Sequence, residues 1–391
     1  MIRKLLIMKI VIAPDSFKGS LTAPQVAEAI EAGFLLVFPS IVTDKLPMAD
    51  GGEGTVASLV ASSDGKMQQV SVLNPLGNQI PSEFGIMGDC QTAVIEMASA
   101  SGLPLISQDQ QNPMLTTTYG TGQLMHAALD TGCKKLIIGI GGSATNDGGA
   151  GMAQALGAKL LDTSGNQIGF GGGSLADIDK IDISGFDPRL SEVDVVVACD
   201  VSNTLTGKDG ASYVYGPQKG ATLDMAEVLD RNLAHFASII KRDLDQSVAD
   251  IPGAGAAGGL GAGLIAFAGA KLQAGIDIVL EVTDFANRIQ GSDLVITGEG
   301  RLDYQTAFGK TPAGVAKIAQ QHNIPVIAIA GSVTEDIDKL YAIGIDAVVD
   351  IFHEPMSLET AMVNASKLIT IAAERAARLI GIGLIKGKLD D

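Results

Sequence analysis

The sequence predicts an α/β fold with two domains. Near-continuous apolar runs, each ending in a loop that contains Gly or Asp, recur at residues 9–13, 136–140, 193–198, 294–297, 326–330 and 347–351. Such runs are typical of parallel strands that helices cover on both faces. Helical patterns follow several of them, at residues 22–34, 151–156, 311–321 and 358–379. This alternation indicates parallel sheets surrounded by helices.

Residues 68–97 depart from the alternation. They contain short strand patterns separated by turn signals around Pro75 and Asp89, with too little chain for crossover helices. We therefore expect local antiparallel pairing there. The simplest arrangement is a discontinuous parallel-sheet domain of residues 8–67 and 290–391, with residues 68–289 inserted as a mixed α/β domain and an active-site cleft between them. The strand at residues 136–140 could belong to either sheet.

Charge and cysteine content limit the classes of partner. With 44 acidic against 27 basic side chains, the formal net charge is -17, which disfavours nucleic acid and anionic membrane surfaces as partners. Cys90, Cys133 and Cys199 show no paired spacing, so they predict neither a disulfide framework nor a zinc site and fit a reducing cytoplasm. Residues 251–270 are uncharged, but they are too rich in Gly for a stable lipid-facing helix. A small anionic ligand would need loop lysines, exposed backbone amides or a divalent metal.

The first of four Gly-rich loops covers residues 139–151, between an apolar strand and a helical pattern. Free backbone N–H groups beside a helix N-terminus favour phosphate there. Asn146 and Asp147 add polar ligands for a hydroxyl group or a metal. The alternative is a tight turn in which one of these two residues only caps the helix. Six glycines and three further polar groups exceed what a cap needs, so we favour phosphate binding.

The second loop, at residues 252–263, contains a formal G-x-G-x-x-G at Gly253, Gly255 and Gly258. A dinucleotide fingerprint requires a preceding apolar strand, and Asp250 and Pro252 interrupt the run where that strand would lie. Close packing of a Gly/Ala helix and phosphate binding by bare backbone both remain open for this loop.

The third loop, at residues 297–303, follows an apolar strand directly. Ligands of open α/β sheets bind outside the carboxyl ends of strands, where Glu299, Arg301 and Asp303 would emerge. Two carboxylates this close could hold Mg²⁺ or accept a hydroxyl proton. Lys310, just before a helix start, resembles the end of a P-loop, but Tyr304 occupies a position where that motif demands Gly. A phosphate contact and an ordinary helix start explain Lys310 equally well.

Further polar residues follow other expected strands. Asp15 and Lys18 follow the first strand, and Asp50 and Glu53 lie in the fourth Gly-rich loop after the second. We expect these four to converge with the carboxylates of the third loop, although each alone is explained by a turn or a cap. In the middle of the chain, Asp200 follows an apolar strand as a candidate base, and Lys219 lies in a Gly- and Pro-containing turn. An Asx turn and a surface lysine are the simpler readings.

The sequence lacks the motifs that several classes of enzymatic reaction require. The four histidines, His126, His235, His322 and His353, lie away from the Gly-rich loops, and the chain has no G-x-S-x-G or H-E-x-x-H motif. Acyl transfer and zinc chemistry are therefore disfavoured. Phosphoryl transfer depends on positioning and charge neutralisation, which Gly-rich loops, lysines and carboxylate-held Mg²⁺ supply.

Six segments together resemble the bacterial type 1 glycerate kinases. They read IVIAPDSFK at residues 10–18, ADGGEGT at 49–55, GIGGSATNDGG at 139–149, GPQKGA at 216–221, PGAGAAGG at 252–259 and ITGEGRLD at 296–303. The resemblance implies ATP-dependent phosphorylation of D-glycerate, generally at the 2-hydroxyl to give 2-phosphoglycerate. It also implies a two-domain α/β architecture with one Rossmann-like domain. The family usually starts near Met8, so Met1 and Met8 both remain open as the initiator. A monomer and a homo-oligomer both remain open.

We assign the following roles as hypotheses from the residues themselves. The ATP phosphates are expected at the loop containing Gly141, Gly142, Ser143 and Asn146, and at Gly253, Gly255 and Gly258. Lys18, Lys219 and Lys310 are candidates to neutralise charge, and Mg²⁺ would be held by some of Asp147, Glu299 and Asp303. The general base would be Asp200 or Asp303, and Arg301 would clamp the glycerate carboxylate, which its planar fork matches.

Two other classes of function compete with a kinase. An NAD-dependent hydroxy-acid dehydrogenase needs a strand before its fingerprint and an acidic residue after the next strand, and the segment around Gly253 offers neither. A non-catalytic binding protein would suit two domains around a cleft, but clustered carboxylates and lysines are costly for binding alone.

Overall fold

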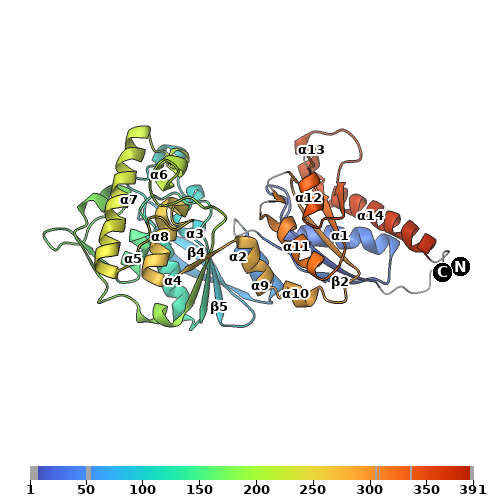
Figure 1. The fold of residues 1–391 in the computed structure, drawn as a ribbon, viewed down its shortest axis with the longest axis horizontal. Helices are drawn as coiled ribbons and strands as arrows, with labels where there is room; N and C mark the ends of the chain where they lie inside the picture. Colours follow the sequence, from blue (N-terminus) through green and yellow to red (C-terminus); the bar gives the residue numbers. More distant parts are fainter. Residues whose placement is uncertain (1–7, 50–53, 304–305, 308, 335–336, 388–391) are drawn as a thin grey trace. The chain divides into compact units, whose positions relative to one another are not determined.

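The computed structural model describes residues 8–49, 54–303, 306–307, 309–334 and 337–387 (Figure 1). The chain divides into two compact units, one of Met1–Asp50 with Ile276–Asp391 and the other of Gly51–Gly275. We call them the terminal unit and the inserted unit. None of the helices in the described ranges is long and apolar enough to cross a membrane.

The terminal unit contains a parallel five-stranded sheet in the order β13-β12-β11-β1-β2. Its strands are β1 (Lys9–Pro14), β2 (Val42–Lys45), β11 (Leu294–Glu299), β12 (Val326–Ala330) and β13 (Ala347–Asp350). From β1 the chain proceeds to one edge through β2, whereas β11, β12 and β13 fill the sheet in the opposite direction. The order therefore reverses between β1 and β11, which is the topological switch point where open α/β sheets bind ligands.

Two long helices cover one apolar core of this sheet. Residues of α1 (Ala23–Val37) and α14 (Ala365–Gly387) share a buried cluster with strand residues such as Ile12 and Ile296. The two helices cross closely because Gly33 leaves room for Thr370, whose carbonyl oxygen would lie 2.4 Å from a Cβ at Gly33. The other helices that begin within this unit are α10 (Phe285–Arg288), α11 (Thr311–Gln321), α12 (Asp338–Ala342) and α13 (Leu358–Val363).

The inserted unit contains a six-stranded mixed sheet in the order β10-β9-β6-β5-β4-β3. Its strands are β3 (Lys66–Leu73), β4 (Gln79–Ile86), β5 (Thr92–Glu96), β6 (Lys135–Gly139), β9 (Asp194–Ala198) and β10 (Lys271–Gln273), and β7 (Lys159–Leu161) pairs separately with β8 (Lys180–Asp182). Strands β3, β4 and β5 pair antiparallel, as the turn signals predict, and the other neighbours pair parallel. The strand left open by the sequence is β6, which lies in this sheet.

The helices of the inserted unit are mostly short. They are α2 (Thr55–Ser62), α3 (Ala98–Ser101), α4 (Tyr119–Asp130), α5 (Ala150–Ala155), α6 (Ala211–Tyr215), α7 (Leu223–Leu244) and α8 (Ala256–Ala268), and α9 (Gly275–Val282) begins at the unit's last residue. Short 3₁₀ turns occur at Leu103–Leu105, Gln108–Gln110, Gly172–Asp177, Pro188–Glu192 and Pro217–Lys219.

The structure differs from the expected elements in two places. The helix expected at residues 358–379 is two helices, because the helix is interrupted at Asn364. The Nδ2 atom of Asn364 donates to the Thr360 carbonyl. The units also divide earlier than the expected domain boundaries. Helix α2 belongs to the inserted unit since Val56 and Val60 pack against Gly85 of β4, and Ile276 belongs to the terminal unit since it packs on Gly314 of α11.

Candidate functional site

The switch point of the terminal unit carries a cluster of charged side chains. Asp15 follows β1 and Glu299 ends β11, and the two strands pair in parallel with Pro14 opposite Gly298. The buried Asp15 carboxylate accepts a 2.7 Å hydrogen bond from the Thr311 hydroxyl at the start of α11. These residues thus come together as their positions at strand ends predict.

Glu299 is a largely buried carboxyl of this cluster. Its Oε1 accepts a 2.6 Å hydrogen bond from Thr306 Oγ1, and its side chain is only 13% exposed. Burial raises the pKa of Glu299 to about 7, and the negative charges of Asp15 and Asp303 act in the same direction. A carboxyl in this environment gains a proton readily near neutral pH, and a nearby cation would stabilise its charged form.

Lys310 lies between two of the carboxylates. Its Nζ is 3.9 Å from Glu299 Oε2 and 3.8 Å from Asp303 Oδ1. Arg301 points further out, with its side chain 67% exposed and its Nε 3.6 Å from Asp303 Oδ2. The backbone nitrogen of Lys18 lies beside Gly300, 3.7 Å from where a Cβ would stand. The expected companions Asp50 and Glu53, and Tyr304 with them, lie outside the described residues.

In the inserted unit, the first Gly-rich loop is exposed only at its start. Gly141 and Gly142 are exposed, whereas every residue from Ser143 to Ala150 is buried. Gly142 has a φ of +73°, a conformation that glycine adopts without strain. Of the residues predicted to bind phosphate in this loop, these two therefore present their backbone to solvent, while Ser143 and Asn146 face the protein interior.

Asp147 occupies the interior of the same loop. Its Oδ2 accepts from the Thr118 amide at 2.8 Å, from the Thr118 hydroxyl at 2.9 Å and from the Gly151 amide at 3.2 Å, while Oδ1 accepts from the Gly149 amide at 3.2 Å. The side chain is fully buried, and burial raises the pKa of Asp147 while these hydrogen bonds oppose the rise. The structure thus places Asp147 as the anchor of the α5 start, and a metal would have to displace these donors.

Two further polar side chains are buried against this loop. Lys219 is 1% exposed, and its Nζ donates to the Thr145 carbonyl at 2.6 Å and to Ser143 Oγ at 3.1 Å. Asn146 is fully buried, its Oδ1 accepts from Ser212 Oγ at 3.3 Å, and its Nδ2 has no hydrogen-bond partner within the described ranges. The sequence suggested an exposed lysine in a turn as the simple reading, and the structure instead buries Lys219.

The glycines of the second loop pack closely against other backbone. The amides of Gly253 and Gly255 both donate to the Asn203 carbonyl, so they are already used. A Cβ at Gly258, where φ is +69°, would lie 1.9 Å from the Thr145 carbonyl oxygen. The element immediately before these residues is the helix α7 and not a strand, and the segment leads directly into α8. Of the two alternatives left open by the sequence, these contacts favour close packing.

Replacing Gly258 by Ala should therefore destabilise the loop that it touches. The added Cβ would collide with backbone, and alanine would also be strained at the positive φ. We expect a loss of about 1–3 kcal/mol of unfolding free energy, measured by urea denaturation. Gly269, with a φ of +61° but no atom within 4 Å of a Cβ, provides the matched control that separates backbone strain from collision. Equal losses in the two variants would contradict the packing role.

Asp200 lies at the end of β9, as the sequence predicts. Asp200 is an exposed residue, and its Oδ1 accepts a 2.9 Å hydrogen bond from the Gly275 amide. The structure thus leaves this carboxylate accessible in the inserted unit, whereas Asp303 lies in the terminal unit.

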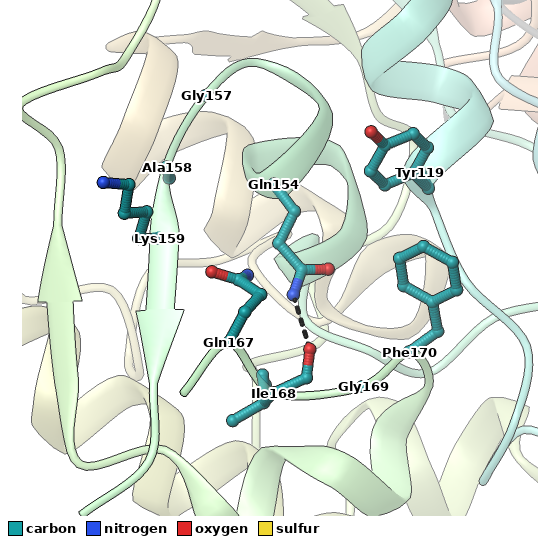
Figure 2. Close-up of a pocket in the computed structure, with 9 residues that line it drawn as sticks. All are labelled: Tyr119, Gln154, Gly157, Ala158, Lys159, Gln167, Ile168, Gly169 and Phe170. Atoms are coloured by element: carbon teal, nitrogen blue, oxygen red, sulfur yellow. Dashed lines mark hydrogen bonds between the residues drawn. The ribbon is translucent and has the colours of Figure 1, made fainter. Parts of the chain in front are cut away.

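A cavity of about 450 Å³ lies beside α5, and no sequence pattern indicated it (Figure 2). The Tyr119 and Phe170 rings meet at one side with centroids 5.1 Å apart, and Gln154 Nε2 donates to the Ile168 carbonyl at 3.2 Å. Its other lining residues are Gly157, Ala158, Lys159, Gln167 and Gly169. Tyr119 directly follows Thr118, so the cavity wall adjoins the residue that holds Asp147.

Sequence reasoning missed the threonines that organise both clusters. Thr306 orients Glu299, Thr311 binds Asp15, and Thr118 binds Asp147. The run Thr116-Thr117-Thr118 before α4 was an available signal, because consecutive threonines at a helix start often supply side-chain hydrogen bonds. The sequence contains no such signal for Thr306, because its partner Glu299 lies at the end of β11, on the far side of a loop.

The Glu299 and Asp303 carboxylates suit a metal ion whose remaining ligands come from the substrate. Within the described residues, no group of three or more His, Cys, Asp or Glu side chains could hold a metal ion alone. Mg²⁺ commonly uses one or two carboxylates together with substrate phosphates and water. Glu299 and Asp303, which both lie within 4 Å of the Lys310 ammonium, fit that donor set.

Comparisons with known proteins agree with one another. The model of the glycerate kinase family matches residues 10–381. The chain is 56% identical to a glycerate kinase of Bacillus subtilis, with 96% of this chain and 98% of that protein aligned. It is 52% identical to a glycerate 2-kinase of Escherichia coli, covering 96% and 99% of the two chains. A crystal structure assigned as glycerate kinase 2 from Salmonella typhimurium superposes with a TM-score of 0.90 at 51% identity, covering 96% of this chain and 99% of that one. The chain therefore belongs to the glycerate kinase family.

Proposed function

We propose that the protein transfers the terminal phosphoryl group of ATP to the 2-hydroxyl of D-glycerate, giving 2-phosphoglycerate and ADP. Family membership supports this reaction class, and the glycerate 2-kinase among the relatives supports the position of transfer. The structural observation that carries the proposal is the cluster of Glu299, Asp303 and Lys310 at the switch point of the terminal sheet. Carboxylates and a lysine at a strand edge suit phosphoryl transfer, which depends mostly on positioning and charge neutralisation.

We assign the binding roles as follows. Glu299 and Asp303 would hold Mg²⁺, which when bound would neutralise charge on the ATP phosphates. Lys310 would neutralise phosphate charge from the same cluster, and Lys18 lies on the neighbouring loop. The exposed backbone of Gly141 and Gly142 would receive phosphate in the inserted unit. Arg301, exposed and planar, would pair with the glycerate carboxylate.

The chemical step needs a base for the glycerate hydroxyl. As the 2-hydroxyl oxygen forms its bond to the γ-phosphorus, the bond to the bridging β-phosphate oxygen breaks and ADP departs. The hydroxyl proton would pass to a carboxylate, for which Asp200 and Asp303 remain the candidates. Asp200 lies in the inserted unit and Asp303 beside Lys310 in the terminal unit, at 3.8 Å from its Nζ.

A direct assay tests the proposal. We expect ADP formation from ATP and Mg²⁺ only when D-glycerate is present, with no oxidation or reduction of NAD(H) when ATP is omitted. Phosphorus NMR of the product should show 2-phosphoglycerate rather than the 3-phosphate. Glycerate-dependent NADH formation without ATP would instead support a dehydrogenase, and tight glycerate binding without turnover would support a binding protein.

Replacing Asp200 by Asn should lower kcat by about 10²-fold if Asp200 is the base. The amide retains an oxygen that can accept from the Gly275 N–H, so the fold should be preserved. Steady-state kinetics with a thermal melt as a check on folding would measure this. Asp209→Asn, at an exposed aspartate of the same unit, is the control. Full activity in the Asp200 variant would leave Asp303 as the base.

A further inference from the structure

The turn that carries Lys219 directs this side chain into the inserted unit. Residues Pro217–Lys219 form a 3₁₀ turn after α6, closed by a 2.9 Å hydrogen bond from the Lys219 amide to the Gly216 carbonyl. Gly220 follows with a φ of +90°, and a Cβ there would lie 2.3 Å from the Gln111 carbonyl oxygen. The glycine thus lets the turn sit close against residue 111. The Gly-Pro-Gln-Lys-Gly motif thereby builds a buried position for one long cationic side chain.

The amine at the end of that side chain joins two parts of the first Gly-rich loop. Its Nζ donates to the Thr145 carbonyl at 2.6 Å and to Ser143 Oγ at 3.1 Å, and the same Oγ accepts from the Thr145 amide at 3.1 Å. Ser143 is also the first buried residue after the exposed pair Gly141 and Gly142. Lys219 therefore fastens the loop at the point where it passes from solvent into the interior.

The same contacts argue against Lys219 as a phosphate ligand. The side chain is 1% exposed, and reaching a ligand would require it to leave both of its acceptors. Burial lowers the pKa of Lys219 to about 7, against which the negative charge of Asp147 acts. Both the charged and the neutral amine can donate hydrogen bonds, so the link to the loop does not depend on the proton.

We propose that Lys219 is a positioning residue, which holds the turn at Ser143–Thr145 so that the backbone of Gly141 and Gly142 is preorganised for phosphate, without itself contacting the nucleotide. The role in nucleotide binding rests on the proposed function, whereas the role in holding the loop does not. Preorganised backbone lowers the cost of ordering a loop on binding, so the effect is expected in ATP affinity more than in the chemical step.

Hydrogen exchange of the full-length protein without nucleotide provides the decisive measurement. In Lys219→Met, which keeps the chain length and removes the amine, we expect amides of residues 143–151 to exchange at least 10-fold faster than in the wild type. Lys208→Met, at an exposed lysine of the same unit, should leave their exchange unchanged. We also expect KM for ATP to rise about 10-fold or more in Lys219→Met, with a smaller change in kcat.

Ser143→Ala supplies a milder variant in case Lys219→Met does not fold. It removes one of the two acceptors and leaves the lysine in place, so it should shift exchange and KM in the same direction by less. The effects of the two substitutions should not add when combined, since both break one connected contact.

Two results would overturn the inference, and a third would overturn only the proposed function. Unchanged loop exchange in Lys219→Met together with a raised KM would make Lys219 a direct phosphate ligand. Faster exchange with an unchanged KM would separate this loop from nucleotide binding. Faster exchange in a protein whose wild type shows no glycerate-dependent ATP turnover would retain the loop-holding role and refute the proposed function instead.

Discussion

Replacing Glu299 by Gln should lower kcat about 10³-fold while making the protein more stable at pH 8. The loss of activity follows because a carboxylate that would share Mg²⁺ with Asp303 becomes a neutral amide, and a metal in such a site contributes several kcal/mol to catalysis. The amide still accepts from the Thr306 hydroxyl through its oxygen, so the local hydrogen bond is kept. Steady-state kinetics across Mg²⁺ concentrations would measure the loss.

The gain in stability follows from the raised pKa of Glu299, about 7 against an ordinary value of 4.5. Between pH 4.5 and 7 the folded protein holds a proton that the unfolded chain has released, so this group's contribution to stability falls as pH rises through that window. Above pH 7 the full cost of the buried charge remains, on the order of 3 kcal/mol. The Gln variant lacks this cost, so the two proteins should differ most at pH 8 and converge near pH 4.

Urea denaturation at several pH values, without Mg²⁺ or nucleotide, checks the stability difference. The control is Glu28→Gln, at an exposed carboxyl on α1 in the same unit. The wild-type kcat/KM should rise with pH through about 7 as Glu299 becomes charged, and this rise should be absent from the residual activity of the variant. Wild-type turnover in Glu299→Gln would remove this residue from the metal site.

Replacing Asp147 by Ala should cost about 3–5 kcal/mol of unfolding free energy. Four hydrogen bonds from Thr118, Gly149 and Gly151 converge on this fully buried carboxylate, and removing it would leave their donors buried without partners. The start of α5 would also lose the group that caps it. Urea denaturation followed by circular dichroism would measure the loss, with Asp177→Ala at an exposed site of the same unit as the control.

The same experiment distinguishes an internal anchor from a metal ligand at Asp147. An anchor is needed whether or not metal is present, so the variant should be destabilised equally in EDTA and in Mg²⁺. A metal ligand would instead leave the metal-free protein as stable as the wild type, or more stable, and abolish the stabilisation by Mg²⁺. That second pattern would contradict the role that the structure indicates.

The fold was largely predictable because buried parallel strands have nearly continuous apolar sequences, which can be recognised as runs. β1, β11 and β12 lie where those runs are, and the meeting of Asp15 with Glu299 follows from the shared edge of adjacent strands. The split of the expected last helix at Asn364 was not predictable, because the apolar pattern continues on both sides of the break.

The candidate site was predictable in its residue types but not in its depth. A carboxylate that follows a Gly-rich strand end has the same sequence pattern whether it binds a metal or caps a helix. Only the structure could therefore show that Asp147 lies in the interior. Lys219 stands among polar and Gly residues, and burial of such a side chain depends on contacts with residues more than 70 positions away. Local patterns carry no record of those contacts.

The interlocking of α8 with the first Gly-rich loop has a consequence for protein engineering. At Gly258 and Gly263 the helix approaches the backbone of Thr145 and Gly148 so closely that even a methyl group would collide. Libraries aimed at changing the preference for the phosphoryl donor should therefore leave both segments intact, and Gly142 with them, because its φ of +73° would strain any other residue.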